Sequence, residues 1–355
     1  GSEADGFDSD DDNAARMRAI AVLDRCRAIS EKLTEVISSF SSGNKDSSGA
    51  LCLYDVKGSA KKEMMFTNEE VKEACAKDLV LSQYQLAGVN WMDVLRRVGV
   101  NGVLADEMGL GKTVQTIAFF GLLRLRSIQM GGTGEAGSGS GTGPHLVIVP
   151  ASVLTNWKKE FERFCPDLHV AVYHGSQNER SEMRTGRLGR ASKDKNGWQP
   201  NVILTTYTIW ERATSGDDRS FLKRFDYQYM ILDEGHSIKN SASSRFKALS
   251  KVRSKHRLLL SGTPVQNNLK ELLALLMFLM PRVFKSEAVE TLLEMLEEGM
   301  KKKLPLNSEN GERKDNSAEL NALDVRNMLA PFVLRRLKAG VLEQLVPKKT
   351  VNEIL

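Results

Sequence analysis

Between Leu81 and Pro281 the sequence alternates short apolar runs rich in Val, Ile and Leu with stretches of helical spacing. Several runs are apolar on both faces, which is typical of parallel strands in a sheet flanked by helices. The alternation predicts an α/β, doubly wound domain. The expected strands are 102–105, 146–149, 170–173, 202–205, 229–232 and 257–260, and the expected helices are 112–126, 152–164, 177–188, 241–252 and 268–279.

The segment ADEMGLGKT, residues 105–113, follows the apolar run GVLA and leads into a helical stretch. This is the context that a phosphate-binding loop requires. Gly109 and Gly111 let the backbone approach an anion without a clashing side chain, and the N–H groups at the helix start point toward it. Lys112 is expected to hold the β- and γ-phosphates of a nucleotide, and the Thr113 hydroxyl is expected to bind Mg²⁺.

A second motif, DEGH, occupies residues 233–236 directly after the apolar run YMIL. A carboxylate at the end of a strand downstream of a phosphate loop is suited to hold the metal ion of a nucleotide. We therefore expect Asp233 to bind Mg²⁺ and Glu234 to polarise the attacking water as general base. An Asp-Glu pair taken alone is more often a solvated surface pair. The functional interpretation therefore depends on the position of this pair downstream of the phosphate loop.

A third motif, LLLSGTPVQNN, occupies residues 258–268. Taken alone, Ser-Gly-Thr-Pro indicates a turn. Placed at the tip of a buried strand, its small hydroxyl side chains are able to connect the acidic site to a neighbouring surface. We expect Lys112 and the Asp233–Glu234 pair to converge across the tips of adjacent strands on one magnesium triphosphate.

The order of these motifs resembles the first RecA-like lobe of superfamily-two helicase-type ATPases, specifically the Swi/Snf-related chromatin remodellers. The further segments that are similar to this family are QYQLAGVNW (83–91, the Q motif), LVIVPASVLTNWKKEF (146–161, motif Ia), ILTTYT (203–208, motif Ib) and FVLRRLK (332–338, after the first lobe). The likeness covers about residues 81–350. Asp106 stands where the strict phosphate-loop pattern has glycine, and this too is normal in the family. DEGH in place of DEAH, with LLLSGTPVQNNLKEL, resembles the SMARCAD-like (Fun/Etl) branch.

The resemblance implies a DNA-dependent ATPase that acts in the nucleus on double-stranded DNA and nucleosomes, with ATP and Mg²⁺ bound in this lobe. Gln85 is then expected to read adenine. The nucleotide-binding residues are expected to be Gln85, Asp106, Glu107, Met108, Gly109, Leu110, Gly111, Lys112, Thr113 and Val114. The residues expected to couple nucleotide state to DNA are His236, Ser261, Gly262 and Thr263. The expected DNA contacts are Asn156, Trp157, Lys158, Lys159, Thr205, Thr206 and Tyr207, although packing in the core is a competing role for Trp157.

Composition and periodicity at the N-terminus, together with the resemblance from residue 81 onward, predict a domain order. The expected segments are an acidic disordered tail (1–12), an N-terminal helical extension and linker (13–80), the ATP-binding lobe (81–281), a helical appendage (282–345) and the start of a linker to a second RecA-like lobe (346–355). Nothing in the chain resembles that second lobe, which carries the arginine fingers of the family. We therefore expect this chain alone to bind ATP weakly and to hydrolyse it very slowly.

The net charge of +5 includes −6 from residues 1–12, so the remainder is basic, which favours a polyanionic partner. Arg180, Arg184 and Arg187 fall on one face of the helix expected at 177–188. That face is either a track for DNA or a solvated surface.

The cysteines Cys26, Cys52, Cys75 and Cys165 lie far apart with no CxxC pair, which argues against a disulfide framework or a zinc site. No apolar run reaches the roughly 18 residues of a membrane helix. The acidic start lacks a secretory signal, and because the chain opens with Gly1 we expect a processed or excised segment.

Two other functions stay open on the sequence alone. An unrelated phosphate-loop enzyme, such as a small-molecule kinase or a GTPase, accounts for GLGKT but not for the ordered motifs that follow it. A non-catalytic DNA- or protein-binding platform accounts for the fold but not for the combination of Lys112, Asp233 and Glu234.

Overall fold

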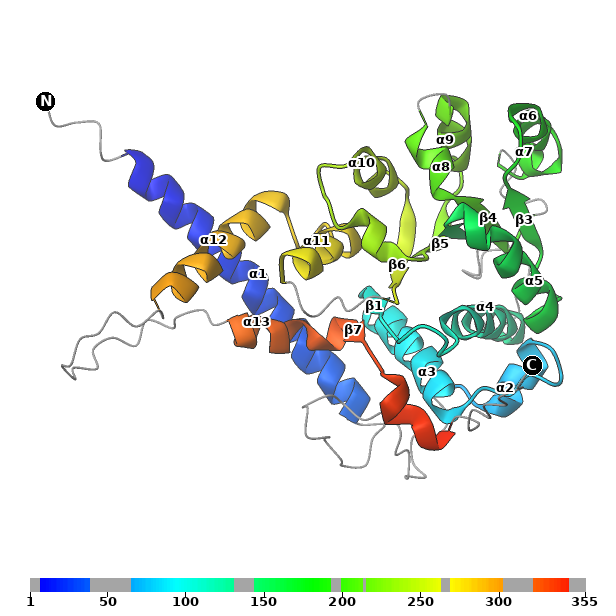
Figure 1. Cartoon of the computed structure of the whole chain (residues 1–355), viewed down its shortest axis with the longest axis horizontal. Coiled ribbons are helices and arrows are strands. Elements are labelled where there is room, and N and C mark those ends of the chain that lie inside the picture. Colours follow the sequence, from blue (N-terminus) through cyan, green and yellow to red (C-terminus); the bar gives the residue numbers. More distant parts are fainter. Residues whose placement is uncertain are drawn as a thin grey trace, which may run out of the picture.

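The computed structural model describes residues 7–38, 65–130, 144–192, 199–212, 215–262, 269–302 and 322–344. Its centre is one parallel sheet of seven strands in the order β3-β4-β2-β5-β6-β1-β7 (Figure 1). The strands are β1 (Gly102–Leu104), β2 (His145–Val149), β3 (Val170–Tyr173), β4 (Val202–Thr206), β5 (Tyr227–Leu232), β6 (Ser254–Leu260) and β7 (Val333–Leu334). The predicted α/β doubly wound class is confirmed.

Burial explains why these runs form strands. Every residue of β1, β2 and β4 is buried, as expected for strands covered on both faces. The sequence analysis missed β7, a two-residue strand that pairs with Val103 and Leu104 of β1. Two residues show no periodicity, so only the tertiary pairing reveals that the appendage after Pro281 contributes a strand to the sheet.

Helices cover both faces of the sheet (Figure 1). On one side α2, α3, α4 and α5 pack together, and on the other side lie α8, α10 and α11. The helices of the lobe are α2 (Asn68–Ala74), α3 (Gln83–Val98), α4 (Lys112–Gln129), α5 (Leu154–Phe164), α6 (Gln177–Thr185), α7 (Arg187–Ala191), α8 (Tyr207–Glu211), α9 (Gly216–Leu222), α10 (Ser244–Ser250) and α11 (Leu269–Leu279). Leu269–Leu279 buries most of its leucines, as its apolar sequence predicts.

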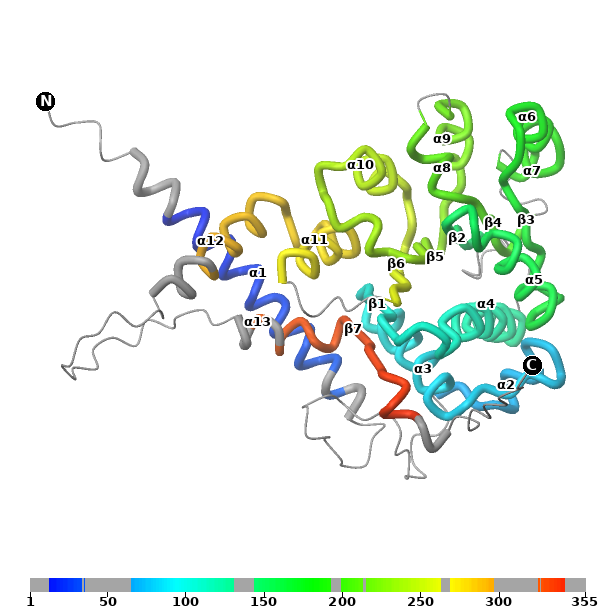
Figure 2. Tube along the Cα trace, viewed as in Figure 1, coloured from blue at the N-terminus to red at the C-terminus, as the bar shows by residue number. Residues whose placement is uncertain are grey.

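The first helix, α1 (Phe7–Ser38), starts earlier than predicted, so the expected disorder of residues 1–12 is wrong from Phe7 onward. The helix crosses α12 (Ser286–Lys302) and α13 (Ala322–Leu329), which belong to the predicted appendage (Figure 2). Residues 39–64 of the predicted extension and linker, the Gly-rich segment 131–143 and the predicted segment 346–355 lie outside the described residues.

The helix expected at 177–188 is two helices that meet at Gly186. A side chain at Gly189 would collide with the carbonyl oxygen of Arg184, because the second helix folds back closely against the first. The sequence predicted one continuous helix across Gly186, because the polar residues on either side of it fit helical spacing. The break places Arg187 on a separate helix from Arg180 and Arg184.

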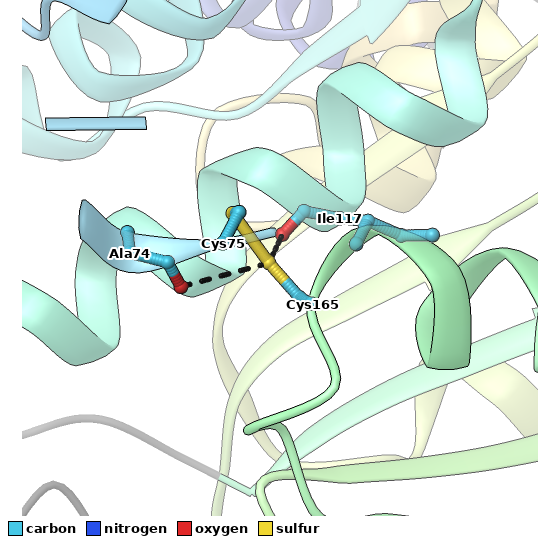
Figure 3. Close-up of a disulfide and its surroundings, with 4 residues drawn as sticks. All are labelled: Ala74, Cys75, Ile117 and Cys165. Atoms are coloured by element: carbon cyan, nitrogen blue, oxygen red, sulfur yellow. Dashed lines mark hydrogen bonds between the residues drawn. A yellow bond between two sulfur atoms is a disulfide. The ribbon is translucent and has the colours of Figure 1, made fainter. Parts of the chain in front are cut away.

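The sequence argued against a disulfide framework, but one pair of cysteines is bonded. Cys75 at the end of α2 and Cys165 after α5 form a disulfide bond (Figure 3). Their separation of 90 residues gives no sequence signal, and α2 itself was missed despite the capping box between Thr67 and Glu70. A side chain at Gly121 of α4 would lie 2.7 Å from both sulfur atoms, so the pair needs glycine at that position.

One buried and one half-buried histidine, His145 and His256, make stability dependent on pH. Burial lowers the pKa of His145, stacked on Phe120, to about 3, and lowers that of His256 to about 4. Both are neutral in the native state, whereas the unfolded chain protonates them below about pH 6.5. We therefore expect stability to fall by about 1.4 kcal/mol per pH unit and per histidine as the pH drops from 6.5 toward 4.

Denaturant titrations at pH 4.5–7.5 measure this slope. His145→Phe keeps an aromatic ring stacked on Phe120 and removes one titrating group. Its stability is expected to depend less steeply on pH than that of the wild type. Parallel curves for the two proteins would show that His145 does not contribute to the slope.

Candidate ATP site

The phosphate loop lies between the end of β1 and the start of α4. Gly109 (φ 88°) and Gly111 (φ 78°) both adopt left-handed backbone conformations, and Gly111 caps α4. Glycine is the residue that takes these angles without strain. The N–H groups at the start of α4 and the amine of Lys112, the first residue of that helix, therefore lie together, an arrangement that suits the phosphates of a nucleotide.

Lys112 is turned toward its own loop. Its Nζ donates to the carbonyl oxygen of Asp106 at 2.7 Å. Burial lowers the pKa of Lys112, while the charges of Asp106, Glu234 and Asp233 act in the opposite direction. A partly desolvated amine surrounded by acceptors is suited to an anionic group such as a triphosphate.

The acidic pair begins where β5 ends. The N–H of Glu234 donates to Asp233 Oδ1 at 3.0 Å, and burial raises the pKa of Asp233. Glu234 (φ 51°) is the one non-glycine residue with a left-handed backbone in the described ranges. Such a conformation costs roughly 1–3 kcal/mol and tends to occur at functional sites.

The phosphate loop and the acidic pair form one electrostatic site. The charges of Asp233 and Glu234 raise the pKa of Lys112, and Lys112 lowers that of Asp233. The three charges are therefore close enough to affect one another, while their convergence on one nucleotide stays a prediction. Contrary to the sequence prediction, the strands that carry them are not adjacent, because β6 lies between β5 and β1. The sequence could not reveal this, since strand order is set by the crossover connections.

The predicted Ser-Gly-Thr motif occupies the tip of β6. The N–H of Ser261 donates to the carbonyl oxygen of Leu104 at 3.0 Å, next to the phosphate loop. A side chain at Gly262 would lie 2.6 Å from Met108 Cγ and 3.9 Å from Lys112 Nζ. Two of the coupling residues therefore lie against the loop, whereas Thr263 lies outside the described residues.

Trp157 and Tyr207 both donate hydrogen bonds to Asp233. The indole N–H of Trp157 donates to Asp233 Oδ2 at 2.8 Å, and the hydroxyl of Tyr207 donates to the carbonyl oxygen of Asp233 at 2.6 Å. Both side chains are buried. The sequence analysis assigned them to DNA contact, with core packing as the alternative for Trp157, and missed that they orient the acid.

Trp157→Phe removes the indole donor and leaves the aromatic packing in place. Because a hydrogen bond to a charged acceptor contributes about 1.5–3 kcal/mol, we expect the free energy of unfolding to fall by that amount. Denaturant titration measures the change. Trp210→Phe is the matched control, since the buried Trp210 Nε1 has no hydrogen-bond partner among the described residues. Equal losses in the two variants would contradict the assignment.

Gln85, the glutamine expected to read adenine, lies beside the phosphate loop. Its Nε2 donates to the carbonyl oxygen of Leu110 at 3.4 Å, and a side chain at Gly111 would lie 2.5 Å from that nitrogen. Its Oε1 accepts from the N–H of Ser82 and caps α3. The structure thus brings the Q motif and the phosphate loop together, while adenine recognition stays a prediction.

Arg336, from the segment FVLRRLK, completes the site and was given no role by the sequence analysis. Its Nε donates to Asp106 Oδ1 at 2.8 Å, its Nη2 pairs with Asp106 Oδ2, and the same Nη2 donates to Gln115 Oε1 at 2.9 Å. Asp106 is fully buried. The residue that departs from the strict phosphate-loop pattern is therefore the anchor of a buried ion pair.

Comparison with known proteins decides the family. The SNF2-related domain matches residues 84–355. The chain belongs to the SNF2-related family. It is 43% identical over 275 residues to ATP-dependent helicase fft3 of Schizosaccharomyces pombe, covering 77% of this chain and 26% of that protein. It is 39% identical over 273 residues to ATP-dependent helicase FUN30 of Saccharomyces cerevisiae, covering 77% and 22%.

A third relative is the human SWI/SNF-related matrix-associated actin-dependent regulator of chromatin subfamily A containing DEAD/H box 1. It is 36% identical over 335 residues, covering 94% of this chain and 28% of that protein. Among solved structures, the Sulfolobus solfataricus SWI2/SNF2 ATPase core in complex with dsDNA matches with a TM-score of 0.56 and 31% identity, covering 76% of this chain and 47% of that one. The RecA-like fold and the predicted branch are thereby confirmed.

The remaining nucleotide-site residues of the SNF2-related lobe are arranged around the loop. Glu107 Oε2 accepts from the N–H of Lys338 at 2.7 Å. Met108 is exposed, Leu110 is buried, and Thr113 and Val114 are half-buried in the first turn of α4.

His236 and the metal ligands complete the list of predicted site residues. His236 Nδ1 lies 3.2 Å from Glu234 Oε2, at an angle that does not make a hydrogen bond. Within the described ranges no three His, Cys, Asp or Glu side chains gather as a metal site. The predicted Mg²⁺ ligands, Thr113 and Asp233, offer oxygen donors, which suit a hard cation, and their role stays a prediction.

The predicted DNA contacts of this SNF2-related lobe divide into two groups. The side chains of Thr205 and Thr206 are fully buried, like those of Trp157 and Tyr207, so none of the four is presented to a duplex in this structure. Thr205 Oγ1, for example, donates to the carbonyl oxygen of Tyr173 at 2.8 Å. The exposed group is Asn156, Lys158 and Lys159 on α5. DNA contact by these three stays a prediction.

Arg180 and Arg184 of the basic helix are ion-paired and do not form a simple solvated face. Arg180 Nε pairs with Asp218 Oδ2 at 3.0 Å, and Arg184 Nη1 pairs with Asp218 Oδ1. Asp218 is buried and also accepts from the hydroxyl of Tyr173. The two arginines therefore form an ion-pair cluster with α9, and DNA contact by this helix stays a prediction.

No helix within the described ranges combines the length and the apolar character that crossing a bilayer requires.

Proposed function

We propose that this chain is the first ATP-binding lobe of a DNA-dependent ATPase that translocates on duplex DNA and remodels nucleosomes in the nucleus. The observation that carries the proposal is the coupling of Lys112 with Asp233 and Glu234 in one site at the tips of β1 and β5. Membership of the SNF2-related family and relatives named as ATP-dependent helicases and as a regulator of chromatin support it.

The roles follow from the geometry. Lys112 and the N–H groups at the start of α4 bind the β- and γ-phosphates, and Thr113 and Asp233 hold Mg²⁺. Glu234, which has a left-handed backbone conformation, orients and deprotonates the attacking water. Ser261 and Gly262, against the loop, respond to the state of the phosphates.

A second RecA-like lobe is part of the proposal. The chain spans about a quarter of the length of the curated relatives it matches. We propose that the remainder includes a lobe that closes over the nucleotide and supplies an arginine, a contribution worth about 10³–10⁵ in rate in related phosphoryl transfers. This chain alone is then expected to bind ATP and to turn it over very slowly.

ATPase turnover with and without duplex DNA tests the function. We expect weak, DNA-insensitive turnover by residues 1–355 and strong stimulation by duplex DNA in a chain extended through the second lobe. Because duplex binding rests on phosphate contacts, rising salt should weaken it steeply. Tight selectivity for guanine nucleotides, or no nucleotide binding at all, would overturn the proposal.

A further inference from the structure

The segment that leaves the first lobe runs directly along the phosphate loop. After β7, the N–H of Ala105 donates to the carbonyl oxygen of Leu334 at 2.7 Å, and the N–H of Glu107 donates to that of Arg336 at 2.9 Å. The N–H of Lys338 in turn donates to Glu107 Oε2 at 2.7 Å. Residues 334–338, which we call the exit segment, therefore extend the sheet pairing to the edge of the nucleotide site.

The side chain of Arg336 ties this segment to the interior of the site. Besides its paired contacts with both oxygens of Asp106 and its bond to Gln115, it donates through Nη1 to the carbonyl oxygen of Tyr84 in α3. Its backbone N–H also donates to Asp106 Oδ1 at 3.2 Å. One guanidinium thus joins the exit segment, the phosphate loop, the Q-motif helix and α4.

The packing around this guanidinium leaves little freedom. A side chain at Gly88 of α3 would collide with Gln115 Oε1 and would lie 2.9 Å from Arg336 Nη2. Both members of the ion pair are buried. A buried pair is expensive to desolvate, and hydrophobic residues of similar volume would often give equal or greater stability. Stability alone therefore does not explain the pair.

Asp106 links this cluster to the phosphate-binding lysine. Its carboxylate is held by Arg336, while its carbonyl oxygen accepts from Lys112 Nζ at 2.7 Å. A triphosphate competes with that carbonyl for the amine. Lys338 lies near the same loop, since a side chain at Gly109 would be 3.3 Å from its Nζ. The contacts of Lys112 and the position of the exit segment consequently both depend on Asp106.

We propose that Arg336 is a positioning residue for the phosphate loop, and that through Asp106 it couples nucleotide binding at Lys112 to the order of the exit segment. The inference rests on the proposed function, because it concerns the same site. Coupling between the two is reciprocal, so weakening the Arg336–Asp106 pair lowers nucleotide affinity, and nucleotide binding in turn orders the exit segment.

The test compares single and double variants of the whole chain. Arg336→Gln leaves a buried unpaired carboxylate and is expected to destabilise the protein. Asp106→Asn combined with Arg336→Gln removes both charges, which is often nearly neutral for stability. We expect this folded double variant to bind Mg-ATP about tenfold more weakly than the wild type. Recovery of wild-type affinity together with stability would mean that the pair is structural only.

Hydrogen exchange at the amides of Glu107, Arg336 and Lys338 gives the second readout. In the wild type, saturating Mg-ATP is expected to slow exchange at these amides, whereas in the double variant it leaves their exchange unchanged. Arg257→Gln is the matched control, because Arg257 is equally buried but donates to three carbonyl oxygens away from the loop. It is expected to lower stability while keeping the nucleotide response.

The outcomes separate the two proposals. If the wild-type chain binds Mg-ATP and hydrogen exchange at the three amides does not change, the role of Arg336 is overturned. The proposed function is then unaffected. An equal response in the wild type and the double variant would overturn the role of Arg336 as well. Wild-type chain that binds no nucleotide at all would overturn the proposed function and the inference that rests on it.

Discussion

Glu234→Gln, placed in a chain extended through the second lobe, is expected to bind Mg-ATP normally and to lose turnover by about 10²–10⁴-fold. The amide keeps the size of the side chain but cannot accept the proton of the attacking water. The left-handed backbone at this position (φ 51°) already aims the side chain, so the substitution changes chemistry more than geometry. Steady-state ATPase kinetics and a nucleotide-binding titration measure the two effects separately.

Glu271→Gln is the control for this substitution. Glu271 is a similarly accessible glutamate that accepts from Lys239 Nζ at 2.9 Å. The same chemical change there should leave kcat within about twofold, since exposed pairs contribute little. Normal turnover by Glu234→Gln would remove Glu234 from the role of general base. A loss of nucleotide affinity instead of turnover would assign it to binding.

Asp218→Ala is expected to be the most destabilising single substitution outside the nucleotide site. It removes the carboxylate that pairs with Arg180 and Arg184 and accepts from the Tyr173 hydroxyl at 2.5 Å. The two guanidinium groups, both largely buried, would lose their counter-charge. Breaking such a buried cluster typically costs about 3–5 kcal/mol.

Chemical denaturation measures this loss, with Glu162→Ala as the control. Glu162 belongs to an exposed pair with Lys158 at 3.7 Å, and exposed pairs contribute about 0–1 kcal/mol. Similar losses of unfolding free energy in the two variants would show that the buried cluster contributes no more to stability than an exposed ion pair. Because neither residue belongs to the nucleotide site, nucleotide affinity of the folded fraction should stay unchanged in both.

The parts of the site that the sequence predicts are those encoded locally. Lys112 and Thr113 follow a strand and open a helix within a few residues, and Asp233 and Glu234 directly end another strand. For these residues, the pattern of apolar runs already implies a position at the edge of a parallel sheet. The fold class and the order of motifs follow from the same local signals.

The parts that the sequence does not predict depend on contacts between distant residues. Arg336 is separated from Asp106 by 230 residues, and Trp157 from Asp233 by 76. The local sequence does not distinguish a buried tryptophan that donates a hydrogen bond from a tryptophan that faces DNA. Likewise, Arg180 and Arg184 look like a basic surface until β3 and α9 bring Asp218 under them. Composition and periodicity carry no information about such partners.

The place of β6 in the sheet has a mechanical consequence. This strand separates the lysine on one flank from the carboxylates on the other, and its tip has no space for a side chain at Gly262. Any sliding of that tip along the strand axis would change both flanks at once. The proposed phosphate-binding and acidic parts of the site therefore share β6 as a common neighbour, which would let a single displacement of that strand reach both parts.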